Sequence, residues 1–575
     1  MIAVRLLCLW LGCTGLRWLI ALPITEPRIF RDELLHWEMA KAVVAHQPFL
    51  LFGQPVDTPA VLYPVVLSVV FWVDHARLAF DLARGINAAC LSAVVFPTYA
   101  LAREFEAPPV AFAAAALAAL VPGGVYSALI MEESLYYPLF VLSCWLCFRV
   151  LTQGAARDAV ACGVVLCLTY FAKPLTLLLV AAYGLALLVW TVRGWRAAGP
   201  LQARLRGLAL RLLPLVCLAG ALAVRHVLAG PGPLPSSASE VVLSRFYAQE
   251  AQGPLVPPLL PTLVVLLALV SALALGTGVV PLAALPGAWM AARRDPRRAW
   301  FLGFTILVLV IYLLGIARHT LLLNETPKIQ ERYLFAVAPL LIVATLTVSP
   351  LAVSRTAAAI VLTAIVLTLG PLAHRLLPRA MDAPSLAIIW ASRRGLGAGL
   401  TCLLAAGAAG TVLIGAVRAR GSLLARVAWI AALPLVLNLG WYWLQYRASP
   451  LEPVWRTVRE LQQRMGPDQR VTVVVSDTSE AQQYLALYAK FWLDGRSTGY
   501  WTGGEPIPWY LDVGGPARDA AARTRADYLA GGSDLQAVCA SAQPVPAADS
   551  KRGQPPVILE VPPGGCGATP TPPTR

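Results

Sequence analysis

The sequence predicts an all-α polytopic membrane protein with a small α/β domain at its C-terminal end. Of its 575 residues, 58% are hydrophobic and only 13% are charged. Hydrophobic runs of about 15 to 25 residues recur from residue 1 to about residue 445, and runs of this length match the hydrocarbon thickness of a bilayer. A soluble fold would need a core too large for its surface. We therefore expect a transmembrane module over residues 1–445 and a tail domain over residues 446–575.

The basic residues give the expected orientation of the module. The net charge is +15, but the arginines do not form the continuous stripe that would suit nucleic acid, so nucleic-acid binding is not expected. They gather instead in short loops between apolar runs, which is the positive-inside pattern of cytoplasmic loops. The clustered residues are Arg193, Arg196, Arg204, Arg206 and Arg211, then Arg293, Arg294, Arg297 and Arg298, then Arg418, Arg420 and Arg426.

About 13 transmembrane helices place all three arginine clusters on one side of the membrane. Residues 60–73 are short for a span, and counting them as a full crossing would move every later loop to the wrong side. The N-terminal run is expected to be a retained helix, because Arg17 interrupts it and no small-x-small cleavage site follows. The predicted helices are 2–22, 85–102, 109–123, 135–151, 159–172, 174–191, 211–229, 258–284, 300–316, 334–348, 356–371, 396–417 and 427–444.

The tail domain has a different pattern and is expected outside the cytoplasm. Residues 470–477 and 555–562 are typical of strands, residues 481–492 are typical of an amphipathic helix, and glycine-rich turns separate them. Cys539 and Cys566 are the two cysteines of the tail, and an extracytoplasmic location would allow them to form a disulfide. The proline-rich C-terminal end is expected to be disordered.

The first outer loop contains a compact acidic group, Asp32 and Glu33 followed by His36 and Glu38. On a helix Asp32 and His36 share one face. A carboxylate beside an apolar wall can act as a general base. An amphipathic helix whose acids only face water explains the same residues equally well.

Further charged residues lie on the same predicted side, where helices enter the membrane. Glu132 and Glu133 precede an apolar run, and the helix dipole alone would favour acids there. Lys173 lies between two apolar segments, and Lys328, Glu331 and Arg332 lie at the mouth of another helix. Single cations at helix ends often snorkel to the interface. On the outer side they run against the positive-inside trend, and an anionic ligand would explain them.

Acids and cations at the outer rim of a helical bundle suit the transfer of a group from a lipid-linked phosphate to a hydroxyl. A departing phosphate needs cations to stabilise its charge, whereas the accepting hydroxyl needs a base. The combination differs from glycoside hydrolysis, in which two carboxylates divide the acid and base roles.

At these residues the sequence resembles the C-type (GT-C) membrane glycosyltransferases. It is most similar to the phospholipid carrier-dependent family that includes protein O-mannosyltransferases and the lipid A aminoarabinose transferase, and in particular to a bacterial branch with the same order of motifs. The resemblance covers roughly residues 20–345. Its motifs are Asp32-Glu33, LYP (62–64), EESLYYPLF (132–140), Lys173-Pro174 and ERYLFAVAPLL (331–341). It implies a helical bundle in the cytoplasmic membrane, an active site on the outer face, and a polyprenyl-phosphate sugar as donor.

The resemblance also implies roles for individual residues. Asp32 becomes the catalytic base with Glu33 beside it, and Glu133 matches the acid of the second motif better than Glu132 does. Lys173 and Arg332 become ligands of the lipid phosphate, Tyr333 lines the pocket, and Lys328 is a further substrate-binding candidate. Members of the superfamily differ in their use of a divalent metal, so the resemblance implies no certain cofactor and leaves a divalent metal open.

Two other functions fit part of the pattern. A transporter or flippase of lipid-linked sugars would also need cations in a bundle, but it should place charges near the membrane midplane and often has repeated halves. The charged motifs here lie at loop–helix junctions, and the sequence has no apparent repeat. A non-catalytic partner in envelope assembly would not need the acid pairs. The expected partners are therefore the lipid-linked donor, a lipid, glycan or protein acceptor, and the bilayer.

Overall fold

The computed structural model of the protein divides into two compact units. The first comprises Met1–Pro23, Asp57–Val70 and Phe80–Leu444, and the second comprises Ile24–Val56, Phe71–Ala79 and Gln445–Arg575. The structure describes residues 2–28, 30–51, 54–56, 58–73, 75–196, 200–228, 257–323, 329–347, 353–372, 382–419, 422–446, 452–466, 468–475, 480–493, 497–501, 513–514, 528–531, 543–544 and 557–560.

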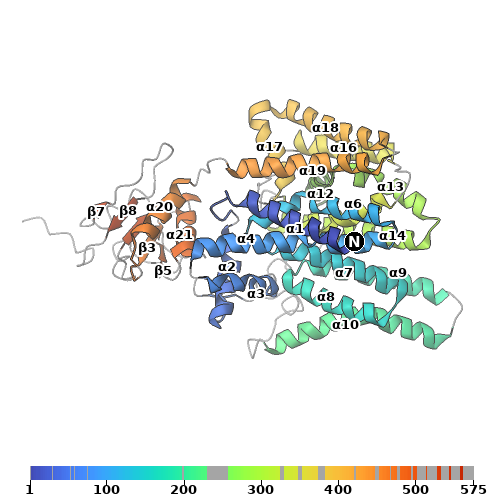
Figure 1. Ribbon diagram of the computed structural model, residues 1–575, viewed down its shortest axis with the longest axis horizontal. Helices are drawn as coiled ribbons and strands as arrows, with labels where there is room; N and C mark the ends of the chain where they lie inside the picture. Colours follow the sequence, from blue (N-terminus) through green and yellow to red (C-terminus); the bar gives the residue numbers. More distant parts are fainter. Residues whose placement is uncertain are drawn as a thin grey trace, which may run out of the picture. The chain divides into compact units, whose positions relative to one another are not determined.

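The first unit is a helical bundle (Figure 1). Its α-helices are α1 (Ile2–Ala21), α3 (Leu62–Leu67), α4 (Ala76–Ser92), α5 (Val95–Arg103), α6 (Pro108–Ala119), α7 (Glu133–Gln153), α8 (Ala156–Ala172), α9 (Thr176–Arg196), α10 (Leu201–Leu228), α12 (Leu259–Gly276), α13 (Val280–Ala292), α14 (Pro296–Leu323), α15 (Ala338–Leu346), α16 (Arg355–Leu369), α17 (Pro384–Leu396), α18 (Ala398–Arg418) and α19 (Leu423–Tyr446). Its 3₁₀ turns are η1 (Ser68–Trp72), η2 (Pro122–Ala128), η3 (Glu331–Tyr333) and η4 (Phe335–Val337). The last two residues of η1, the first residues of α4 and the last two of α19 belong to the second unit.

The polytopic helical fold predicted from the sequence is confirmed. Among the described residues, nine helices are long and apolar enough to cross a membrane, and α6 with η2 forms a tenth candidate that is bent by 56°. The shorter helices α8, α15 and α16 account for the remaining predicted spans. Helix α3 with η1 covers only Leu62–Trp72. At about 1.5 Å per residue in α3 and about 2.0 Å per residue in η1, this element is about 19 Å long, well short of a bilayer core of about 30 Å.

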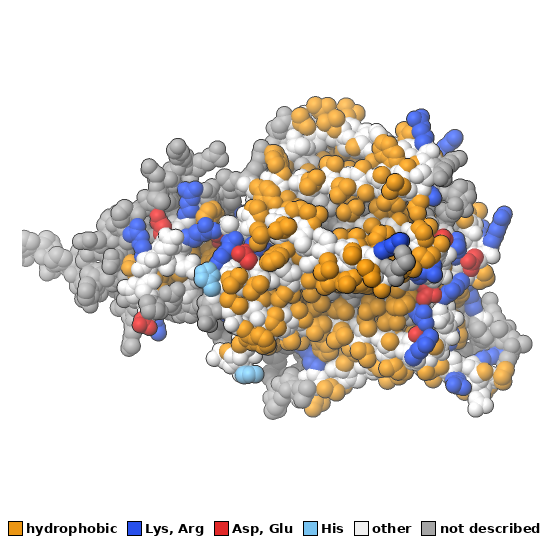
Figure 2. All heavy atoms as spheres, in the orientation of Figure 1, with side chains coloured by type: hydrophobic (Ala, Val, Ile, Leu, Met, Phe, Trp, Pro, Cys, Tyr) orange, Lys and Arg blue, Asp and Glu red, His pale blue; other side chains and the backbone are white. Residues whose placement is uncertain are grey.

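The surface of the helical unit suits a lipid environment. Large apolar side chains point outward along its helices, among them Leu19, Leu188, Val216 and Leu403. Figure 2 shows this mostly hydrophobic face, with lysine and arginine side chains gathered at one end of the unit. The positive-inside rule predicts such a cluster of basic residues at the cytoplasmic end of a membrane protein.

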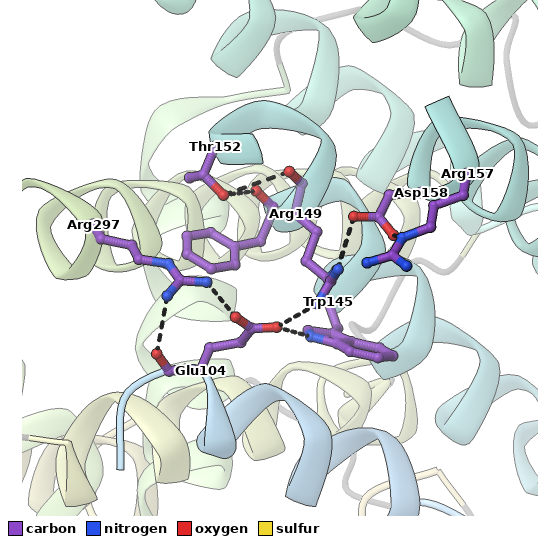
Figure 3. Close-up of polar contacts among 8 residues, drawn as sticks. Glu104, Trp145, Arg149, Thr152, Arg157, Asp158 and Arg297 are labelled. Carbon is purple, nitrogen blue, oxygen red and sulfur yellow. Dashed lines mark hydrogen bonds and ion pairs between the residues drawn. The ribbon is translucent and has the colours of Figure 1, made fainter. Parts of the chain in front are cut away.

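A network of hydrogen bonds and ion pairs links α5, α7, α8 and α14 (Figure 3). Glu104 accepts hydrogen bonds from Trp145 Nε1 at 2.9 Å and Arg149 Nη1 at 3.0 Å, and it also pairs with Arg297. Arg149 bridges onward to Asp158 at 2.9 Å. Some of the arginines near the predicted cytoplasmic loops are therefore neutralised by carboxylates on neighbouring helices.

The second unit combines the predicted first outer loop with the tail. The loop contributes α2 (Phe30–Ala45) and a short hairpin of β1 (Leu50–Leu51) and β2 (Gln54–Pro55). The tail contributes two helices and a six-stranded sheet of order β5-β4-β3-β6-β8-β7 (Figure 1). The tail elements are α20 (Glu452–Arg464), β3 (Val471–Val475), α21 (Glu480–Leu493), β4 (Ser497–Trp501), β5 (Val513–Gly514), β6 (Tyr528–Gly531), β7 (Gln543–Pro544) and β8 (Val557–Glu560).

The tail is the α/β domain that the sequence predicts. Both predicted strands form, as β3 and β8, and the predicted amphipathic helix forms as α21. Strands β5, β4, β3 and β6 run parallel, and β8 and β7 add an antiparallel edge. All five residues of β3 are buried, as expected for a central parallel strand. The predicted pairing of Cys539 with Cys566, and the C-terminal end expected to be disordered, lie outside the described residues.

Candidate active site

The segment that joins α6 to α7 is buried and held by side chains from distant helices. Asn438 Nδ2 donates to the carbonyl oxygen of Leu120 at 2.7 Å, and Asn87 Nδ2 donates to that of Leu129. Buried carbonyl groups need such partners, and satisfying them fixes the backbone path through η2. The start of α7 is therefore held in one place.

Two glutamates lie at the start of α7. Glu132 is the residue that caps α7, and Glu133 is its first residue, with no exposed surface. The helix dipole favours carboxylates at this position. Burial of a carboxylate is costly unless a cation accompanies it, so two buried acids imply cations nearby.

Lys173 supplies the first of these cations. It ends α8 in an extended conformation, as expected for a residue that precedes a proline. Its carbonyl oxygen accepts a hydrogen bond from Thr176 Oγ1 at 2.8 Å, which closes the turn into α9. The Lys173 amine lies 2.8 Å from Glu132 Oε1 and 2.6 Å from Glu133 Oε1.

Arg332 supplies the second cation, from η3. Its backbone nitrogen donates to the carbonyl oxygen of Asp382 at 3.0 Å, and its own carbonyl oxygen accepts a hydrogen bond from the hydroxyl of Tyr137. The Arg332 Nε lies 3.7 Å from Glu133 Oε1, 3.5 Å from Asp382 Oδ1 and 3.2 Å from Gln330 Oε1. Both the backbone and the side chain of Arg332 are thus held by neighbouring segments.

The ring of Tyr333 connects the two cations. Lys173 Nζ lies 4.6 Å from its centroid, and the guanidinium carbon of Arg332 lies 5.0 Å from it. The Tyr333 hydroxyl accepts a hydrogen bond from Arg332 Nη2 at 3.2 Å. The ring of His319 meets Tyr333 edge-on at 5.6 Å. Such cation–aromatic contacts stabilise charges that are shielded from water.

Carboxylates outnumber cations in this cluster. Glu132, Glu133 and Asp382 face Lys173 and Arg332. Burial acts to lower the pKa of Lys173, but the two glutamates outweigh it, so its pKa is raised and the amine stays charged. The oxygen Glu133 Oε2 is buried and has no hydrogen-bond partner within the described part of the chain.

Glu331 ties the cluster to α17. Its carboxylate accepts hydrogen bonds from the backbone nitrogens of Ser385, at 3.0 and 3.1 Å, and Leu386, at 3.3 Å. These nitrogens lie in the first turn of α17 and have no partner within the helix. Burial raises the pKa of Glu331 to about 7, although these hydrogen bonds act in the opposite direction.

The other predicted acids belong to the second unit. Asp32 and Glu33 lie in the first turn of α2. Glu33 is fully buried, and its Oε2 accepts a hydrogen bond from the backbone nitrogen of Arg28, whereas Asp32 is partly exposed. Glu38 forms an ion pair with Lys41 at 3.1 Å on the same helix.

The structure brings five of the predicted site residues together: Glu132, Glu133, Lys173, Arg332 and Tyr333. Lys328 lies outside the described residues. Sequence reasoning missed Asp382, Gln330 and His319. Asp382 lies in a loop that is predicted to be on the outer side, as are the predicted site residues. That shared location was the one feature of the sequence that could have indicated Asp382 as a site residue.

The residues do not form a recognisable metal site. Within the described ranges, no group of three or more histidine, cysteine, aspartate or glutamate side chains is placed to hold a metal ion.

Comparison with solved structures gives the fold. The crystal structure of ArnT from Cupriavidus metallidurans in the apo state superposes with a TM-score of 0.59 at 14% sequence identity, covering 97% of this chain and 98% of that chain. The structure of the same protein bound to undecaprenyl phosphate gives a TM-score of 0.56 at 14% identity, covering 96% and 97%. The oligosaccharyltransferase of Archaeoglobus fulgidus is more distant, with a TM-score of 0.44 at 10% identity over 92% of this chain and 69% of that chain.

No protein-family model matches the chain, and a search of curated proteins finds no match. The fold likeness to ArnT nevertheless extends over nearly the whole of both chains, helical module and tail together. The chain therefore has the fold of ArnT from Cupriavidus metallidurans, a polytopic helical fold of the kind that the sequence predicts.

Proposed function

We propose that the protein is an integral-membrane inverting glycosyltransferase that moves a sugar from a polyprenyl-phosphate donor to an acceptor hydroxyl. The observation that carries the proposal is the buried cluster of Glu133, Lys173 and Arg332 at helix ends in a bundle with the ArnT fold. An ArnT crystal structure contains undecaprenyl phosphate, a ligand of the proposed chemical class. We place the reaction on the outer face of the bacterial cytoplasmic membrane, following the arginine loops.

Lys173 and Arg332 are the proposed ligands of the donor phosphate, and Tyr333 lines the same pocket. The lysine ammonium has three N–H donors, and the two glutamates engage two of them, so a phosphate oxygen can bind the third or replace one carboxylate. Glu132 is the more exposed of the two glutamates, at 7% against 0%, and is the partner that can move away. Glu133 would remain, and its unpartnered Oε2 can accept a hydrogen bond from a sugar hydroxyl.

In the proposed step, the acceptor hydroxyl attacks the anomeric carbon from the face opposite the phosphate. The new bond between carbon and acceptor oxygen forms while the bond to the phosphate oxygen breaks, and the configuration inverts. The hydroxyl proton passes to the carboxylate of Asp32. The departing polyprenyl phosphate keeps the bonding electrons, and Lys173 and Arg332 stabilise its charge.

Asp32 suits the role of base better than Glu33 does. The carboxylate of Glu33 is buried and holds the backbone of Arg28, whereas Asp32 is partly exposed one residue earlier. A base must reach the proton that it removes, and a fully buried carboxylate engaged with its own backbone cannot do so readily. Glu33 therefore acts as a structural neighbour of the base.

A donor panel tests the proposal. The purified protein in nanodiscs is incubated with radiolabelled polyprenyl-phosphate mannose, glucose, arabinose and N-acetylglucosamine, together with bacterial envelope extract as acceptor. We expect label to leave the carrier for at least one donor, with release of polyprenyl phosphate. In sealed vesicles a flippase would move the intact donor across the bilayer instead, and that result without any transfer would contradict the proposal.

A further inference from the structure

The chain that leads into α2 is anchored by the helices of the tail, within the second unit. Glu26 is 1% exposed, and both of its carboxylate oxygens are engaged. Oε1 pairs with Arg459 of α20, and Oε2 accepts a hydrogen bond from Trp492 Nε1 of α21 at 2.9 Å. The loop acid is thus held between two helices that lie more than 400 residues later in the sequence.

The next two residues are anchored as well. The carbonyl oxygen of Pro27 accepts a hydrogen bond from the hydroxyl of Tyr488 at 3.1 Å. Arg28 Nη2 donates to the carbonyl oxygen of Gln445 at 3.2 Å. Three consecutive residues of the loop therefore bind the C-terminal part of the chain.

Helix α2 itself packs on the same tail helix. Trp37 is 1% exposed, and its ring stacks on Phe491 at 4.8 Å with an interplanar angle of 22°. Tyr488, Phe491 and Trp492 lie at spacings of three and four residues, so α21 presents them on one face. That single face contacts both the loop before α2 and α2 itself.

The anchored residues lead directly into the acid pair. Glu33 accepts a hydrogen bond from the backbone nitrogen of Arg28, which joins the anchored loop to the first turn of α2. We propose that α20 and α21 hold the acid-bearing end of α2 in place, with Glu26, Arg459 and Trp492 as positioning residues for Asp32. The catalytic consequence rests on the proposed function, whereas the anchoring does not.

Among the three positioning residues, Arg459 is the critical one, because its positive charge pairs with the buried carboxylate of Glu26. Burial raises the pKa of Glu26, and the pairing with Arg459 acts in the opposite direction. Removing the arginine leaves a buried carboxylate without its ion pair, which is more costly than losing an exposed pair. The Glu26 carboxylate must then take up a proton or move toward water, and in either case the loop loses its ion pair to α20 and the first turn of α2 is held less firmly.

Hydrogen–deuterium exchange on the full-length protein in nanodiscs tests the anchoring. In Arg459→Ala, we expect exchange of residues 28–36 to rise by about tenfold or more, as the buried Glu26 carboxylate loses its ion pair and the segment opens locally. Arg459→Lys should restore most of the protection. Gln462→Ala, an exposed change on the same helix, should leave exchange unchanged. Trp492→Phe keeps an aromatic ring, though a smaller one, and removes the Nε1–H donor to Glu26, so it serves where Arg459→Ala does not fold.

Transfer kinetics with the donor accepted from the panel test the positioning. We expect Arg459→Ala and Trp492→Phe to lower kcat with little change in donor KM, and Arg459→Lys to recover kcat. Unchanged exchange in both variants would overturn the anchoring. Raised exchange with wild-type kcat would overturn the positioning of Asp32. Raised exchange in a protein that transfers sugar from no donor would support the anchoring and count against the proposed function alone.

Discussion

Lys173 lies within 2.8 Å of Glu132 and 2.6 Å of Glu133, so the lysine and the glutamates depend on one another. Lys173 therefore has two roles. It neutralises buried acids in the resting protein, and it is the proposed ligand of the donor phosphate. A substitution at this position therefore has to be assessed for stability before its effect on activity is interpreted.

A double-mutant cycle separates these roles. Lys173→Met should lower the free energy of unfolding by about 3 kcal/mol, because it removes the cation nearest to two buried carboxylates. Adding Glu133→Gln should recover part of that loss, since one unpaired charge is removed. Thermal unfolding of the four proteins in the same detergent measures the coupling. Strictly additive losses would mean that the pair does not interact as its geometry indicates.

Glu331 gives a pH-dependent prediction. Its pKa is raised from 4.5 to about 7, so the folded protein binds this proton more tightly than the unfolded chain does. The stability that this proton contributes is complete below about pH 4.5 and is lost as the pH rises through about 7. Glutamine at position 331 does not titrate. The free energy of unfolding of Glu331→Gln, relative to wild type, should therefore increase by on the order of 3 kcal/mol between pH 4.5 and pH 7, and its Tm relative to wild type should rise with it. A Tm difference that stays constant over this range would contradict the assignment.

At the scale of elements, the start of α7 and the turn η4 meet at Gly123 of η2. A Cβ atom there would lie 2.6 Å from Tyr137 Cε2 and 2.8 Å from Phe335 Cβ. Tyr137 in turn donates its hydroxyl hydrogen to the carbonyl oxygen of Arg332. Close packing at one glycine therefore helps to set the position of η3 and its arginine.

Gly123→Ala should disturb this contact. We expect the free energy of unfolding to fall by about 1–3 kcal/mol, as for overpacking in a tight core. Gly184→Ala in α9 is a matched control, because among the described residues no atom beyond its chain neighbours and its own helix backbone lies within 4 Å of the Cβ position. Its Tm should equal or exceed that of wild type. If Gly123→Ala proves as stable as Gly184→Ala, the packing at η2 is looser than the distances indicate.

At the scale of the whole molecule, hydrophobic periodicity predicts the helices well because each span must satisfy its own backbone in lipid. The sequence also predicts β3 and α21 correctly, because the patterns that indicate them lie within a few neighbouring residues. The partners of Lys173 and Arg332 are not local. Asp382 lies 50 residues after Arg332, and spacing along the chain cannot show that the two meet. The sequence therefore predicts the residue types of the cluster, but not that its cations are already paired.

The predicted topology can be tested by labelling. Single cysteines at Asp32→Cys and Pro296→Cys, in a background without native cysteines, should react with a membrane-impermeant maleimide from opposite sides of sealed vesicles. Position 32 should react from the extracytoplasmic side, because the positive-inside rule predicts that the arginine loops face the cytoplasm. Reaction of both positions from one side would overturn the predicted orientation.

The central claim is that Asp32 is the base for sugar transfer from a polyprenyl phosphate. Its most direct test is the rate of label transfer, with the donor accepted from the panel, by wild type, Asp32→Asn and Glu38→Gln. Glu38 lies on the same helix and pairs only locally with Lys41 among the contacts described here. We predict that Asp32→Asn loses at least about 100-fold in kcat, the range for a general base, while remaining folded and inserted. Glu38→Gln should retain wild-type kcat. Full turnover by Asp32→Asn would contradict the claim.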